Sequence, residues 1–97
     1  MGFMPPTSGA RISALGIWAD TPGSLILYET GPRLEDSLRD MAQVFGNREA
    51  AVTRELTKLY EEVRRGTLEE LSAYYKENGA PKGEIVVVVA PKGEVEV

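Results

Sequence analysis

The chain has 97 residues, of which 42% are hydrophobic and 27% are charged, and its formal net charge at pH 7 is -4. This length and balance are typical of one globular domain with a packed core. The absence of cysteine and histidine excludes disulfides, thiolate metal sites and catalytic Ser/His or Cys/His pairs, and no metal site is expected. Because the net charge is negative, RNA binding would require a local basic patch.

Nothing in the sequence indicates export or a membrane span. The longest apolar stretch, at residues 85–91, is far shorter than the roughly 20 residues that a membrane-spanning helix needs. The first residues have no basic region that leads into an apolar stretch. We therefore expect a cytoplasmic protein.

A short helix and a strand are the first predicted elements. Ser8 can cap the helix, and the Pro and Gly at residues 22–23 give a turn after it. The apolar residues of this helix share one face: Ile12, Leu15 and Trp18. The apolar run at residues 24–29, SLILYE, is bounded by turn residues and has the length of a strand, so it predicts an interior strand.

An amphipathic helix follows this strand. Pro32 suits the first turn of a helix, and Gly46 gives the signal for its end. Between them, apolar residues recur at spacings of four, three and four: Leu34, Leu38, Met41 and Phe45. This spacing predicts that one helical face is buried.

The last third of the chain predicts a capped helix and a strand. Thr67 and Glu70 have the spacing of a capping box, in which each side chain accepts a hydrogen bond from the other residue's amide. The helix would bury Leu68, Leu71 and Tyr75 and end at Gly79. The β-branched run at residues 83–91 is typical of a strand that is covered on both faces. Strand, helix and strand thus follow one another twice, which indicates crossover connections.

Residues 50–65 give conflicting signals. Apolar residues at spacings of four, three and four favour one amphipathic helix here: Val52, Leu56, Leu59 and Val63. However, residues 50–55 (AAVTRE) and 60–67 (YEEVRRGT) could also form two strands before the capping box. The period favours the helix, and the residues themselves leave both structures open.

Four separated blocks resemble one protein family. They are GFMPP at 2–6, LILYETGPRLEDSL at 25–38, RELTKLYEEVRRGTLEEL at 54–71 and KGEIVVVV at 82–89. In order and spacing they are similar to the C-terminal half of methyltransferases of the tetrapyrrole methylase superfamily. The most similar branch is the bacterial 16S rRNA (cytidine-2′-O)-methyltransferases, which use S-adenosyl-L-methionine to methylate a cytidine ribose in small-subunit ribosomal RNA.

The resemblance implies an α/β fold with a mixed β-sheet of about four to five strands flanked by helices. Residues 50–65 would then be strand, loop and strand. It also implies that residues 1–97 are the C-terminal domain of a two-domain enzyme whose Gly-rich N-terminal domain is absent here. In this superfamily the cofactor lies between the two domains, so we expect this part to be inactive by itself. The implied partners are 16S rRNA, through the longer protein, and a second copy in a homodimer.

The resemblance further implies that loops at three strand ends contact the cofactor, largely through backbone groups. The cofactor-binding candidates are Tyr28, Glu29, Arg54, Glu55, Leu56, Thr57, Gly83 and Glu84. The catalytic residue is not assigned, but Glu55 is a candidate because a carboxylate can orient a ribose hydroxyl or accept its proton. Alternatively, the two glutamates Glu29 and Glu55 could pair with Arg33 or Arg54 and only brace the loops.

The RNA-binding candidates are basic residues: Arg11, Lys58, Arg64 and Arg65. Their natural use would be contact with phosphate, but a solvated face paired with Glu61 and Glu62 explains them equally well. Two other functions stay open. One is methylation of corrin or porphyrin intermediates, although those enzymes usually have an NGT-like turn where this chain has RELTK. The other is a domain that only dimerises or binds partners.

Overall fold

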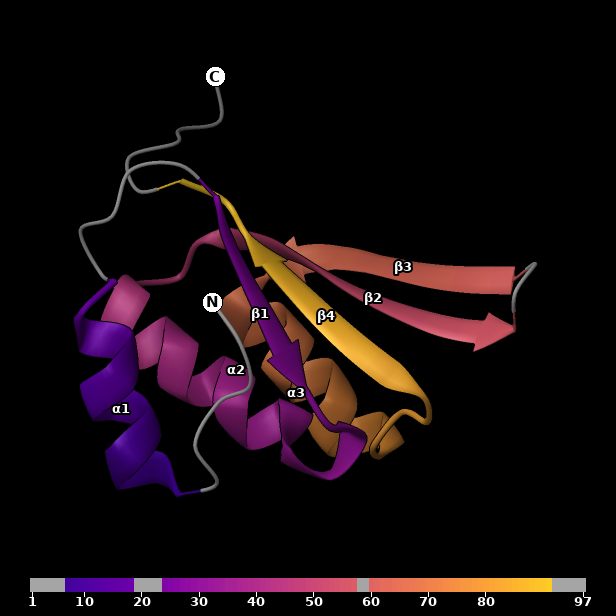
Figure 1. Ribbon diagram of the computed structural model, residues 1–97, viewed down its shortest axis with the longest axis horizontal. Coiled ribbons are helices and arrows are strands. Elements are labelled where there is room, and N and C mark those ends of the chain that lie inside the picture. Colours follow the sequence, from indigo (N-terminus) through magenta and orange to yellow (C-terminus); the bar gives the residue numbers. More distant parts are fainter. Residues whose placement is uncertain (1–6, 19–23, 58–59, 92–97) are drawn as a thin grey trace.

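The computed structural model describes residues 7–18, 24–57 and 60–91. Its elements, in chain order, are α1 (Ser8–Gly16), β1 (Leu25–Glu29), α2 (Gly31–Phe45), β2 (Glu49–Thr57), β3 (Tyr60–Thr67), α3 (Leu68–Asn78) and β4 (Glu84–Val89). The strands form one sheet, and the helices lie together on one of its faces (Figure 1). Within the described ranges, no helix has both the length and the apolar character that crossing a bilayer requires.

The strand order is β1-β4-β2-β3, and each neighbouring pair in this sheet is antiparallel. The predicted α/β fold is confirmed, with four strands in the described part of the chain, but the prediction of a mixed sheet is wrong. β1 and β2, which α2 connects, run in the same direction but have β4 between them. In the same way, β2 separates β3 from β4. Each strand–helix–strand unit is thus split by an antiparallel strand, which local sequence patterns do not reveal.

The apolar run of β1 belongs to an edge strand, so the prediction of an interior strand is wrong. Leu25 and Leu27 are fully buried under the helices, whereas Ile26 and Tyr28 are 48% and 44% exposed on the uncovered face. In β4, which is interior, alternate residues such as Val87 are buried and the others are half-buried or exposed. The prediction that β4 is covered on both faces is therefore also wrong, because the helices cover one face only.

The two long helices form as their sequences predict. In α2 the four periodic apolar residues are buried, proline lies at the start and the helix ends before Gly46. In α3 both hydrogen bonds of the capping box are present. The Glu70 amide donates to Thr67 Oγ1 at 3.2 Å, and the Thr67 amide donates to Glu70 Oε1 at 2.8 Å. Leu68, Leu71 and Tyr75 of α3 are buried, as predicted.

Residues 49–67 form the hairpin of β2 and β3, which confirms the strand, loop and strand implied by the resemblance. The helix favoured by the apolar period is wrong. Val52 is buried against the helices, whereas Val63 is paired with Thr53 and is 44% exposed on the other face. The helical spacing therefore does not correspond to one buried stripe, because strand residues alternate between faces.

A buried ion pair joins α1 to α2. The N-cap of α1 is Thr7, which accepts a hydrogen bond from the Ala10 amide, whereas Ser8, the predicted cap, donates to Asp40 Oδ2 at 2.9 Å. Arg11 Nε lies 2.9 Å from the same oxygen, and the Arg11 and Asp40 side chains are 3% and 4% exposed. Arg11 is therefore a structural residue, and its burial is incompatible with the predicted RNA contact in this arrangement.

Candidate functional site

Antiparallel pairing brings the three predicted cofactor segments to one end of the sheet. The last residues of β1 pair with the first residues of β4, because Glu29 is opposite Ile85 and Tyr28 is opposite Val86. β2 meets the same end of β4, where Glu55 is opposite Glu84. In an antiparallel pair, the end of one strand always lies beside the start of its partner. This explains why a site at two strand ends also includes the start of β4.

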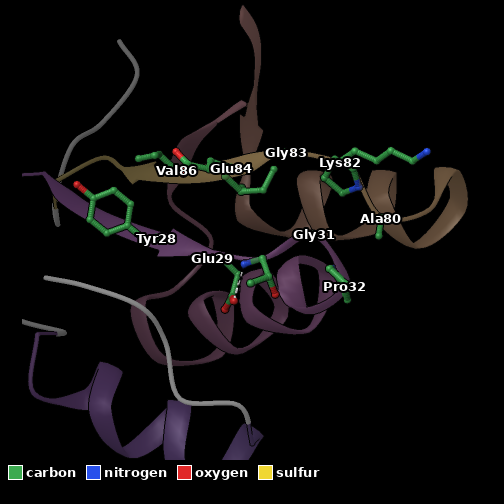
Figure 2. A pocket seen from close by; sticks show the side chains of 12 residues that line it. Tyr28, Glu29, Gly31, Pro32, Ala80, Lys82, Gly83, Glu84 and Val86 are labelled. Atoms are coloured by element: carbon green, nitrogen blue, oxygen red, sulfur yellow. Dashed lines mark hydrogen bonds between the residues drawn. The ribbon is translucent and has the colours of Figure 1, made fainter. Parts of the chain in front are cut away.

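A cavity of about 860 Å³ lies at this end (Figure 2). Its walls are the end of β1, the first residues of α2, the segment of residues 80–83 and the start of β4. Four of the cofactor-binding candidates line it: Tyr28, Glu29, Gly83 and Glu84. Its volume is within the range of small-molecule sites, which is about 300–1,000 Å³.

Tyr28 and Glu29 have different environments although they are consecutive. Figure 2 shows their side chains pointing to opposite sides of β1. Tyr28 is 44% exposed, whereas Glu29 is 2% exposed. The Glu29 carboxylate accepts hydrogen bonds from the Thr30 amide at 2.8 Å and from the Ser37 hydroxyl. Its charge lies at the N-terminus of α2, where the helix dipole stabilises an anion. Glu29 thus braces the start of α2. It does so through the Thr30 amide and the Ser37 hydroxyl, and not through an ion pair with Arg33 or Arg54 as the alternative in the sequence analysis supposed.

Two glycines shape the backbone of the cavity wall, and only one of them, Gly83, was among the predicted site residues. A Cβ atom on Gly31 would lie 2.0 Å from the Pro81 carbonyl oxygen, so the start of α2 is in direct contact with the segment of residues 80–83. Gly83 has a φ of 97°, which residues with a side chain rarely adopt. The Gly-Pro pair after β1 and the Pro-Lys-Gly sequence before β4 are the signals that could have identified this close approach.

The remaining cofactor candidates lie outside this cavity or beyond the described side chains. Arg54 lines a smaller cavity of about 300 Å³, to which residues 80–82 also contribute. The backbone of residues 55–57 continues β2, with an irregularity between Glu55 and Thr57. The structure describes no side-chain positions for Glu55, Leu56 and Thr57, so their roles stay predictions.

The basic candidates of the hairpin do not gather on one face. Arg64 and Arg65 are consecutive in β3 and point to opposite faces of the sheet. The Arg64 guanidinium lies 3.8 Å from the centroid of the Tyr74 ring, in a cation–π contact, whereas Arg65 is exposed on the open face. Lys58 lies outside the described residues, as does the GFMPP block.

The alkaline stability of the fold should depend on Tyr75, which lies behind Arg64 and is 6% exposed. Burial raises the pKa of the Tyr75 hydroxyl above its ordinary 10.0, although the nearby Arg64 guanidinium lowers it. As the pH rises past about 10, the unfolded chain loses this proton before the folded chain does, so stability should fall. Melting temperatures between about pH 8 and pH 11 should decrease more steeply for the wild type than for Tyr75→Phe. If the melting temperatures of the two proteins fell equally steeply with pH, this prediction would be contradicted.

Comparison with known proteins identifies relatives of this chain. No model of a known protein family matches it. A protein of Erythrobacter litoralis named ribosomal RNA small subunit methyltransferase I is 50% identical over 93 residues, which are 96% of this chain and 33% of that protein. This chain is homologous to part of ribosomal RNA small subunit methyltransferase I. Proteins of that name from Mesorhizobium japonicum and Halalkalibacterium halodurans are 45% and 43% identical and cover 93% and 97% of this chain.

The chain spans about a third of the length of these relatives, from 31% to 33%. The matches cover nearly the whole chain, so they confirm the resemblance that the four sequence blocks indicated. The residues that form the cavity between β1, α2 and β4 lie within the homologous part.

Proposed function

We propose that this chain is the C-terminal domain of an S-adenosylmethionine-dependent methyltransferase that acts on a cytidine ribose 2′-hydroxyl in 16S rRNA. The observation that supports the proposal best is the cavity of about 860 Å³ at the meeting point of the strand ends. It occurs in a chain that is 50% identical to part of a ribosomal RNA small subunit methyltransferase I. The domain would form one wall of the cofactor site, and the rest of the enzyme would form the other.

Backbone groups are the proposed cofactor contacts on this wall. Tyr28 and Glu29 lie at the end of the edge strand β1, and their backbone groups belong to the wall of the cavity. Such groups, with the backbone at Gly83 and Glu84, can donate to and accept from the polar parts of a nucleoside and an amino acid. When bound, S-adenosylmethionine supplies the methyl group. Glu55, which follows Arg54 in β2, is proposed to orient the ribose hydroxyl.

The RNA contacts proposed for this domain are few. Arg65 is exposed, and Lys58 precedes β3 in the connection between the two strands of the hairpin. We propose that both contact phosphate, which supplies much of the affinity in RNA binding. With a net charge of -4, this domain would depend on the rest of the enzyme for most of its attraction to RNA. We also propose a cytoplasmic homodimer.

A chimera tests the proposed function. This chain would replace the homologous third of the Erythrobacter litoralis relative. Methyl transfer from tritiated S-adenosylmethionine to small ribosomal subunits that lack the modification would then be measured. We expect label in RNA at a nucleotide whose 3′ phosphodiester resists alkaline cleavage, because 2′-O-methylation removes the attacking hydroxyl.

The controls separate the remaining functions. The unaltered relative shows that the assay works, and the relative without its homologous third gives the background. Cofactor binding without label in RNA would contradict the RNA substrate, and retention of a corrin or porphyrin would then favour the other enzyme class. A folded chimera that neither binds the cofactor nor transfers methyl groups would refute the proposal and favour a non-catalytic domain.

A further inference from the structure

The segment between α3 and β4 contributes to two cavities. Residues 80–82 line both the cavity of about 860 Å³ and the smaller cavity of about 300 Å³. Arg54 lines the smaller one. A side chain that contacts this segment can change the shape of the larger cavity without touching a ligand in it.

Arg54 is hydrogen-bonded to the segment of residues 80–82 and to the neighbouring strand β3. It lies on the side of β2 that faces the helices, as Val52 does, because strand residues alternate. Its Nε donates to Glu62 Oε1 at 2.9 Å, and its Nη1 donates to the Lys82 carbonyl oxygen at 3.2 Å. A planar guanidinium can serve both acceptors in fixed directions, which a lysine ammonium cannot.

The bond to the Lys82 carbonyl also orients the next amide. No described peptide bond is cis, and in a planar trans peptide the carbonyl and the following N–H point in opposite directions. The Lys82 carbonyl accepts from Arg54, which lies on the side of the smaller cavity. The Gly83 N–H is therefore directed away from the Arg54 guanidinium. Gly83 lines the larger cavity, and Figure 2 shows it there beside Glu84.

We infer that Arg54 is a positioning residue that aims the Gly83 N–H at an acceptor of the ligand in the larger cavity. The inference rests on the proposed function, in which that ligand is S-adenosylmethionine with its ribose hydroxyls and carboxylate as acceptors. Arg54 then acts through the Lys82–Gly83 peptide group, whereas the resemblance implied direct contact with the cofactor. Glu62 holds the guanidinium in place.

The Arg54–Glu62 ion pair contributes more to the position of the Arg54 side chain than to the stability of the fold. The Arg54 and Glu62 side chains are 22% and 38% exposed, and partly exposed ion pairs contribute little to the free energy of folding. A binding site, in contrast, is sensitive to displacements of about 0.5–1 Å in its walls. Substitution of Arg54 should therefore affect cofactor binding while the fold persists.

Steady-state kinetics of the chimera test this role. Arg54→Lys should raise the KM for S-adenosylmethionine about tenfold, as expected for one lost charged hydrogen bond, and leave kcat within about twofold. Glu62→Gln should raise KM less, because the guanidinium keeps the Lys82 carbonyl. The matched control is Arg39→Lys, since Arg39 also pairs with two carboxylates but lies on α2, away from this cavity. It should change neither constant.

A spectroscopic measurement on the 97-residue chain tests the peptide orientation without any cofactor. With [15N]glycine labelling, the Gly83 amide resonance should shift in Arg54→Lys and stay in place in Arg39→Lys. An inactive parent chimera would refute the proposed function, and this resonance would still decide the role of Arg54. An unshifted Gly83 resonance, or an unchanged KM in an active and folded Arg54→Lys chimera, would overturn the inference.

Discussion

Replacement of Asp40 with alanine should lower the free energy of unfolding by about 3–5 kcal/mol, because it removes the carboxylate that pairs with the buried Arg11 guanidinium. Arg11 Nε and Asp40 Oδ2 are 2.9 Å apart, and the two side chains are 3% and 4% exposed. Ser8 would lose the same acceptor. Domains of this size are stable by about 5–15 kcal/mol, so much of the stability would be lost. Urea denaturation followed by circular dichroism measures the change.

Two variants control this prediction. Asp36→Ala removes a carboxylate that is 49% exposed and 2.9 Å from Arg39, and it should cost less than about 1 kcal/mol. The double variant Arg11→Met with Asp40→Leu should be more stable than Asp40→Ala, because an apolar pair carries no uncompensated charge. If Asp40→Ala costs no more than Asp36→Ala, then the ion pair is not buried as described.

Replacement of Gly31 with alanine should weaken both the fold and the candidate site. The new Cβ atom would lie 2.0 Å from the Pro81 carbonyl oxygen, which is backbone and cannot rotate away. Overpacking of this kind typically costs about 1–3 kcal/mol. Because the segment of residues 80–83 must move, the affinity of the chimera for S-adenosylmethionine should also fall. Denaturation measures the first effect, and calorimetric titration measures the second.

Gly9→Ala is the matched control for this variant. Gly9 lies in α1, and a Cβ atom there would meet nothing within 4 Å. Alanine is favoured over glycine in a helix by about 0.5–1 kcal/mol, so this variant should be equally or more stable and should bind like the parent. A Gly31→Ala protein that matches Gly9→Ala in both measurements would show that the contact with Pro81 is not close.

Four of the eight residues predicted to bind the cofactor lie together in the structure. Tyr28, Glu29, Gly83 and Glu84 do line one cavity, and they were named through the resemblance. Periodicity could not find them, because a cavity formed by backbone approach has no apolar period. Arg11 could not be recognised as a structural residue from the sequence. Nothing near a basic residue in the sequence indicates whether a distant carboxylate will pair with it in the interior, as Asp40 does here.

The sequence by itself determined those elements whose signals are local. The start of α2 at proline, its apolar stripe, the capping box of Thr67 and the β-branched run of β4 specify their structures through neighbouring residues. The sequence also identified the relatives, because whole blocks keep their order.

The tertiary structure decided what depends on distant partners. Residues 50–65 have a helical period, yet they form a hairpin because β4 supplies a paired edge for β2. β1 has the composition of an interior strand, but the insertion of β4 next to it leaves it at the edge. The same antiparallel insertion sets the end of β1 against the start of β4 and so creates the cavity. Strand order depends on which long-range pairings bury the most surface together, and no short window of sequence contains that information.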